Sequence, residues 1–71
     1  MKDDRLRIGL IGCGHMGSYY AHNIAKNPDV EITICCDPSP EKLERFREKW
    51  NISNSTTDWT EVISFKPDGI I

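Results

Sequence analysis

Residues 8–17, Ile-Gly-Leu-Ile-Gly-Cys-Gly-His-Met-Gly, decide how this chain folds. The last six of them, Gly12 to Gly17, form a Gly-x-Gly-x-x-Gly pattern. The apolar run from Leu6 to Ile11 predicts a β-strand, and the segment from Ser18 to Lys26 predicts a helix. Strand, glycine turn and helix in this order are the context in which the pattern indicates a dinucleotide-binding site.

Each glycine has a physical task in that interpretation. Gly12 allows the tight turn out of the strand, Gly14 lets the backbone approach a pyrophosphate, and Gly17 lets the helix pack closely on the strand. The backbone N–H groups of His15, Met16 and Gly17 lie at the helix start, where they have no partner within the helix. Together with the helix dipole they would form an anion site.

An acidic residue follows the glycine pattern at the spacing expected of a ribose-binding carboxylate. Asp37 ends the next apolar run, Val30 to Asp37, twenty residues after Gly17. This is close to the spacing of the carboxylate that binds the adenosine ribose hydroxyls in dinucleotide-binding folds. A carboxylate repels a 2′-phosphate, and no basic residue follows at once in Pro38-Ser39-Pro40. We therefore expect NAD as the cofactor rather than NADP.

Two further segments show periodic patterns. In the first helix, Met16, Tyr20 and Ile24 form one stripe, with small residues beside it. The run from Val30 to Asp37 predicts a second strand. Strict alternation would place four of its residues on one face: Val30, Ile32, Ile34 and Cys36.

A second helix is expected after Asp37. Ser39 suits its N-cap and Pro40 its first position. Its buried stripe would be Leu43, Phe46 and Trp50. Its solvated face, for which we infer no partner, would be Glu41, Arg45, Glu48 and Lys49.

The last third of the chain continues the alternation of strands and helices with shorter elements. A short strand is expected within Ile52 to Thr56, and Asp58 with Glu61 resembles a capping box at the start of a short helix. Ile70 opens a new apolar run, in which the sequence stops. The pattern predicts a Rossmann-like, doubly wound α/β fold with a parallel sheet. We expect residues 1–71 to be part of one dinucleotide-binding domain at the front of a longer protein.

Composition excludes several other classes. The 71 residues are 38% hydrophobic and 28% charged, with a net charge of −2 and no basic run, which argues against nucleic-acid binding. No stretch is long and apolar enough to suggest a membrane span, and no signal peptide is apparent, so we expect a cytoplasmic protein. Cys13, Cys35 and Cys36 fit neither a disulfide framework nor a metal-binding spacing, and we interpret them as small buried residues in a reducing compartment.

Three stretches together resemble the N-terminal part of the Gfo/Idh/MocA oxidoreductases, the family of glucose–fructose oxidoreductase and inositol dehydrogenase. They are Arg7 to Gly17, the Cys-Asp-Pro-Ser-Pro-Glu-Lys run at 36–42, and Thr57-Asp58-Trp59 with the Pro-Asp-Gly-Ile-Ile run at 67–71. The resemblance covers nearly the whole chain, and the aspartate-centred turn makes it more specific than the glycine pattern alone.

The resemblance implies an enzyme that uses NAD or NADP to oxidise or reduce sugars, inositols or related polyols. Gly12, Gly14 and Gly17 carry over as the pyrophosphate turn, and Asp37 as the ribose ligand. His15 and Met16 carry over through their backbone positions. The family's Glu-Lys-Pro segment with its catalytic lysine, its histidine and its substrate domain would lie beyond residue 71, so no catalytic residue is assigned here. The parent could form a homo-oligomer.

Two alternatives stay open at this point. One is a non-catalytic module that senses or binds a dinucleotide. The other is a methyltransferase-like domain that binds S-adenosylmethionine, although such domains usually carry a different glycine pattern.

Overall fold

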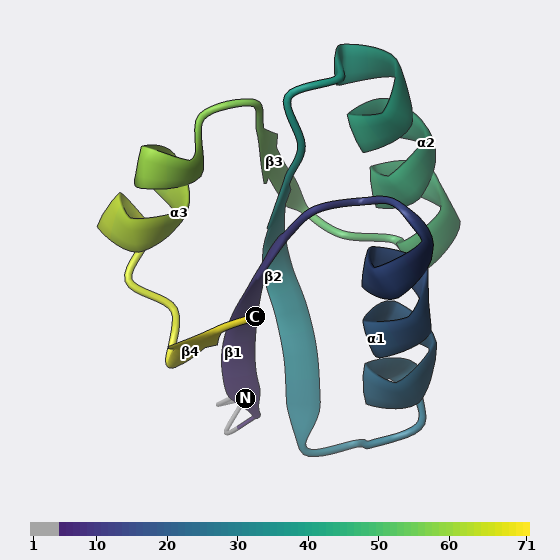
Figure 1. Cartoon of the computed structure of the whole chain (residues 1–71). Coiled ribbons are helices and arrows are strands. Elements are labelled where there is room, and N and C mark those ends of the chain that lie inside the picture. The colour runs from purple at the N-terminus through teal and green to yellow at the C-terminus, as the bar shows by residue number, and fades with distance from the viewer. Residues whose placement is uncertain (1–4) are drawn as a thin grey trace.

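The computed structural model describes residues 5–71, which alternate between strands and helices along their whole length (Figure 1). In chain order the elements are β1 (Leu6–Ile11), α1 (His15–Ala25), β2 (Val30–Cys36), α2 (Pro40–Trp50), β3 (Asn54–Thr56), α3 (Trp59–Ser64) and β4 (Gly69–Ile70). Among these residues, no helix combines the length and the apolar character that crossing a bilayer requires.

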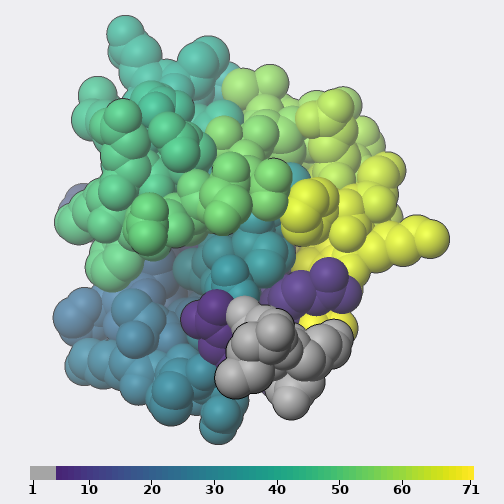
Figure 2. Space-filling model, turned by 180° about the vertical axis from the view of Figure 1, so that it is seen from behind, coloured from purple at the N-terminus to yellow at the C-terminus, as the bar shows by residue number. Residues whose placement is uncertain are grey.

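The four strands form one parallel sheet with the order β3-β2-β1-β4. Helices α1 and α2 cover one face of this sheet, and α3 covers the other (Figure 1). In the view from behind, β3 lies between the teal α2 and the lime-green α3 (Figure 2). The predicted Rossmann-like, doubly wound architecture is confirmed, and it brings the carboxyl ends of β1, β2 and β3 to one edge.

Each face of the sheet has its own hydrophobic core. Seven buried residues form the core under α1 and α2: Leu10, Cys13, Ala21, Cys35, Leu43, Phe46 and Ile52. The smaller core under α3 consists of Ile34, Cys36 and Val62. Gly9 allows α3 to come close, because a Cβ at this position would lie 2.6 Å from a methyl carbon of Val62.

The alternation predicted for β2 is wrong in its first half. Ile8 pairs with Ile32 but the next residue, Gly9, pairs with Ile34, so that Thr33 is an extra residue in β2. Such a bulge reverses the faces of the residues before it. Ile32 therefore packs with Cys35 under α1 and α2, while Ile34 and Cys36 lie under α3.

Helix α1 begins three residues before the predicted start, at His15 instead of Ser18. The glycine pattern, Gly12 to Gly17, therefore overlaps the first three residues of the helix. The predicted stripe of Met16, Tyr20 and Ile24 is not the buried side of this helix, since 61% of Met16 is exposed, whereas the small residues Gly17 and Ala21 beside the stripe are buried. Small residues face the sheet here because the helix lies very close to the strand ends.

The ends of the other two helices largely follow the sequence. Ser39 caps α2, where its hydroxyl accepts a hydrogen bond from the Lys42 N–H at 3.4 Å, and Pro40 is the first helical residue. Asp58 caps α3 by accepting from the Thr60 N–H at 2.9 Å. The predicted capping box is only half formed. Its second half would need the Glu61 carboxylate to accept from the Asp58 N–H, but this carboxylate accepts from the Thr56 hydroxyl.

Leu10→Ala tests the larger core. Leu10 is 1% exposed, so the variant should lose about 2–5 kcal/mol of unfolding free energy through lost burial and a residual cavity. Leu6→Ala is the matched control in the same strand, because Leu6 is 55% exposed and its truncation should cost less than about 1 kcal/mol. Urea unfolding followed by circular dichroism measures both, and equal losses would contradict the assignment of the core.

Candidate functional site

The glycine turn joins β1 to α1 at the carboxyl edge of the sheet. Gly12 has a φ of +99°, a conformation that side chains rarely adopt, and its N–H donates to the Cys36 carbonyl at 2.7 Å. Gly17 lies against the same turn, since a Cβ at Gly17 would be 2.1 Å from the Gly12 carbonyl oxygen. Both residues must therefore be glycine for structural reasons.

Gly14 differs from the other two glycines because its surroundings are open. It is the N-cap of α1, and its carbonyl accepts from the Ser18 N–H at 2.9 Å. A Cβ on Gly14 would meet no atom within 4 Å. The first three N–H groups of α1 lie directly after it, and helix geometry leaves them without intrahelical acceptors. Open space over these donors fits a pyrophosphate.

Two hollows flank the glycine turn. One, of about 340 Å³, lies toward β4 and is lined by Ile11, Gly12, Gly14, Met16, Gly17, Tyr20 and Ile71. The other, of about 250 Å³, lies toward α2 and is lined by Cys13, Ser18, Lys42, Arg45, Phe46 and Lys49. An extended ligand across the turn would thus have an apolar hollow on one side and a cationic hollow on the other.

Asp37 ties the glycine turn to the turn before α2. One carboxylate oxygen accepts from the Cys13 N–H at 2.9 Å, and the other accepts from the Ser39 N–H at 2.9 Å. The residue is buried, with 8% of its surface exposed. These two backbone donors, with a smaller effect of the Lys42 charge, lower the pKa of Asp37 below its ordinary value. Asp37 is therefore ionised at neutral pH and can still accept from ribose hydroxyls through its remaining lone pairs.

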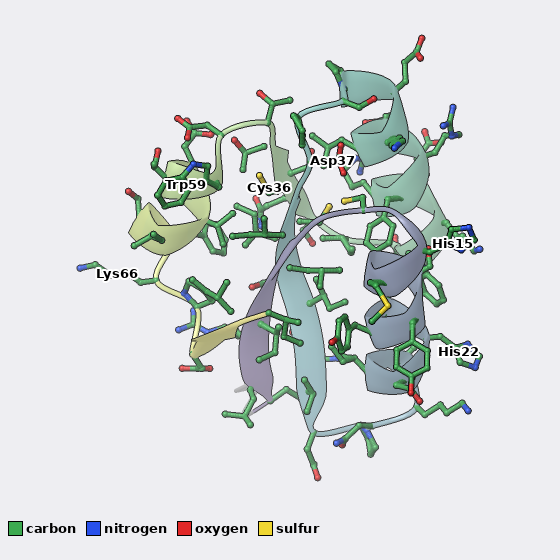
Figure 3. All side chains as sticks on the ribbon, viewed as in Figure 1. His15, His22, Cys36, Asp37, Trp59 and Lys66 are labelled. Atoms are coloured by element: carbon green, nitrogen blue, oxygen red, sulfur yellow. The ribbon has the colours of Figure 1, made fainter. Side chains whose placement is uncertain are left out.

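The side chains of His15 and Met16 are exposed. In Figure 3 the ring of His15 projects from α1 on the side away from the sheet, as does that of His22 further along the helix. The structure thus brings together Gly12, Gly14, Gly17 and Asp37. The backbone N–H groups of His15 and Met16 lie beside them in the first turn of α1, and their binding role stays a prediction.

The three cysteines are free, and their burial confirms the interpretation of them as small buried residues. The Cys13 thiol donates to the Cys36 carbonyl at 3.5 Å, inside the site. Burial raises the pKa of Cys36, and the neighbouring Cys35 thiol, together with burial, raises the pKa of Cys13. In residues 5–71, no three His, Cys, Asp or Glu side chains are grouped as a metal site would need.

Sequence reasoning missed the cationic hollow. It assigned Arg45 and Lys49 to a solvated face of the second helix and did not connect them with the glycine turn. The signal was present in the spacing, because Lys42, Arg45 and Lys49 follow one another at i+3 and i+7 and so share one side of α2.

A family model described as "Oxidoreductase family, NAD-binding Rossmann fold" matches residues 6–71. The chain belongs to the Gfo/Idh/MocA oxidoreductase family. It therefore carries this family's NAD-binding Rossmann domain, and the glycine turn and Asp37 described above lie within the matched residues. A comparison with curated proteins gives no match.

Solved structures of dehydrogenases share the fold. The WlbA dehydrogenase from Chromobacterium violaceum, solved with NADH and UDP-GlcNAcA, has a TM-score of 0.88 at 21% identity over 99% of this chain and 21% of its own. Scyllo-inositol dehydrogenase from Lactobacillus casei has a TM-score of 0.84 at 19% identity, with 99% and 21% covered. A probable dehydrogenase from Thermotoga maritima is 30% identical, with a TM-score of 0.81 and 86% and 18% covered. The chain spans about a fifth of these relatives' length.

Substitution of two glycines separates folding from ligand binding. Gly17→Ala should destabilise the fold by more than about 2 kcal/mol, because its methyl group would overlap the Gly12 carbonyl. Gly14→Ala should cost at most about 1 kcal/mol, since its methyl group enters open space, yet it should weaken dinucleotide binding by crowding the pyrophosphate. Thermal unfolding and NADH titration measure the two effects. Unchanged NADH affinity in Gly14→Ala would contradict the placement of the pyrophosphate.

Asp37→Asn tests the link between the two turns. An amide offers one acceptor oxygen where the structure needs two, so the variant should lose about 1–3 kcal/mol of stability at pH 7. The pKa of Asp37 is lower in the folded state than the unfolded value of about 3.9, so its contribution is present above that pH and is lost as the pH falls through the folded pKa.

The difference in unfolding free energy between wild type and Asp37→Asn should therefore shrink from pH 7 toward pH 2. Other carboxylates are common to both proteins and cancel in this difference. Urea unfolding across this range provides the measurement, and a difference that grew on acidification would refute the proposed link.

Proposed function

We propose that this chain is the cofactor-binding part of an oxidoreductase that transfers a hydride between a nicotinamide dinucleotide and a sugar, inositol or related polyol. The observation that carries the proposal is the hydrogen bond from the Cys13 N–H to Asp37. It joins the two groups that a dinucleotide needs, an N–H-lined turn for the pyrophosphate and a carboxylate for the ribose.

Each site residue has a defined task in this proposal. The backbone N–H groups of His15, Met16 and Gly17 bind the pyrophosphate at the start of α1, and Gly14 leaves room for it. Asp37 accepts hydrogen bonds from the adenosine ribose hydroxyls, which favours NAD as the cofactor. The bound nicotinamide supplies the hydride chemistry, and the protein supplies binding and orientation.

The substrate class is proposed on the names of the structural neighbours. They include a myo-inositol 2-dehydrogenase from Lactobacillus plantarum and a scyllo-inositol dehydrogenase solved with NAD(H) and scyllo-inositol. We propose that a further domain of a longer parent binds the substrate and supplies the catalytic residues, and that residues 1–71 are part of the dinucleotide-binding domain. The three free thiols suit a reducing compartment, and we propose the cytoplasm.

Titration of wild type and Asp37→Ala with NADH and NADPH tests the function. NADH should bind to the wild type, and S-adenosylmethionine should not. Asp37→Ala should weaken NADH binding more than NADPH binding, because only NADH has the free 2′-hydroxyl that the carboxylate accepts from. The ratio of the two losses cancels any effect of the variant on the glycine turn itself. Binding of S-adenosylmethionine alone, or equal losses for the two dinucleotides, would contradict the proposal.

A further inference from the structure

Two of the three cysteines lie next to each other beneath the glycine turn. Cys13, the second residue of that turn, and Cys35, near the end of β2, belong to the same hydrophobic core and are 7% and 0% exposed. Their thiols share a side-chain hydrogen bond. Cys36 lies on the opposite face of the sheet, in the core under α3, because neighbouring residues of a strand point to opposite faces. Among the three cysteines, only Cys13 and Cys35 therefore form a pair.

The path of the glycine turn brings these two thiols together. Ile11 pairs with Cys36 in the sheet, and the Gly12 N–H then donates to the Cys36 carbonyl at 2.7 Å. The Cys13 thiol donates to the same carbonyl at 3.5 Å. Cys13 is thus folded back over the end of β2, where Cys35 is the preceding residue of the strand. The contact between the thiols follows from backbone geometry that the fold requires.

The two thiols differ in access and in freedom to move. Cys35 lies inside the sheet, where it pairs with Leu10 of β1 on one side and with Ser55 of β3 on the other. Cys13 lies in a turn and lines the open hollow toward α2, of about 250 Å³. A small reagent would therefore reach Cys13 first. Any movement that joins the two sulfur atoms would fall on Cys13, since Cys35 is held by both neighbouring strands.

The hydrogen bond between the thiols favours ionisation within the pair. It lowers the pKa of Cys35, and the charge of Arg47 adds to this effect while burial opposes it. The same hydrogen bond, together with burial, raises the pKa of Cys13. One proton is thus shared between two sulfur atoms, and it can move from one to the other. The pair can supply a thiolate, which is the form of cysteine that acts as a nucleophile.

We propose that Cys13 and Cys35 form a reversible disulfide with hydrogen peroxide as the oxidant, and that this disulfide weakens dinucleotide binding at the glycine turn. The Cys13 sulfur attacks one peroxide oxygen, the O–O bond breaks, and the other oxygen leaves as water with the thiol proton. The Cys35 sulfur then displaces the hydroxyl group of the resulting sulfenic acid, which leaves with the second thiol proton as water. The two thiols together lose two electrons, and the peroxide gains them.

The disulfide would act on the dinucleotide site through the position of Cys13. A covalent S–S bond is shorter than the contact between two hydrogen-bonded sulfur atoms, so Cys13 must move toward β2. This movement would pull the Cys13 N–H away from Asp37 and shift the first N–H groups of α1, which follow directly. These groups bind the pyrophosphate in the proposed function, on which this second half of the inference rests. By reciprocity, a bound dinucleotide would slow formation of the disulfide.

The experiment treats the reduced 71-residue chain with hydrogen peroxide, removes the peroxide, and counts free thiols by alkylation and intact mass. Wild type should lose two of its three thiols and the mass of two hydrogen atoms, and dithiothreitol should restore both. Cys36→Ala is the matched control, because it keeps the pair and should form the same disulfide. Cys35→Ala should form none. Proteolytic mapping of the oxidised wild type and Cys36→Ala should find the link at Cys13 and Cys35, whether or not Cys35→Ala folds.

Titration of the same samples with NAD⁺ measures the effect on binding. NAD⁺ should bind to the oxidised wild type about fivefold or more weakly than to the reduced wild type, and dithiothreitol should restore the affinity. The affinity of Cys35→Ala should not change on treatment with peroxide. Saturating NAD⁺ should slow the loss of thiols in the wild type.

Two sets of results would overturn the inference. Retention of all three thiols, a Cys35–Cys36 disulfide, or disulfides only between chains would reject the pairing of Cys13 with Cys35. A Cys13–Cys35 disulfide with unchanged NAD⁺ affinity would reject its effect on binding and leave the proposed function standing. If the reduced chain failed to bind NAD⁺, the proposed function and the control of binding would fall together, and disulfide mapping would still decide the pairing.

Discussion

The rest of the structure depends on how closely α1 approaches the glycine turn. A Cβ on Gly17 would lie 2.1 Å from the Gly12 carbonyl oxygen, so that the first turn of the helix can rest directly on the end of β1. This contact fixes the helix start at His15 and directs its first N–H groups over the carboxyl edge of the sheet. A side chain at Gly17 would push the helix away, and the donors would no longer converge on one point.

The Asp37 carboxylate extends this arrangement to the second strand. By accepting from the N–H groups of Cys13 and Ser39, it holds the glycine turn and the turn before α2 in fixed positions relative to each other. The same group is the proposed ribose ligand, so the residue that orders the site is also the one proposed to recognise the ligand. Because α2 begins within this second turn, its cationic stripe, starting at Lys42, is also positioned beside the glycine turn. Backbone geometry thus determines which charges surround the site.

Much of this could be predicted from the sequence, because the decisive signals are local. The order of strand, glycine pattern, helix and acid predicted the fold, and Ser39-Pro40 predicted the start of α2. The sequence contained no sign of the extra residue Thr33, because a bulge is defined by the pairing of two strands and the alternation within one strand does not reveal that pairing. The cationic hollow was missed for a similar reason. Its walls come from two helices, and only the packing of α2 beside α1 shows that the charges of one face the turn of the other.

Backbone amide chemical shifts during a titration with NAD⁺ test the central claim most directly. In a ¹⁵N-labelled chain, the account predicts that the largest shifts fall on His15, Met16 and Gly17, with a smaller group around Asp37. The turn at residues 27–29, which joins α1 to β2 at the opposite edge of the sheet, should stay unchanged. Saturation by NAD⁺ with the largest shifts away from the glycine turn, or no shifts at high NAD⁺, would contradict it.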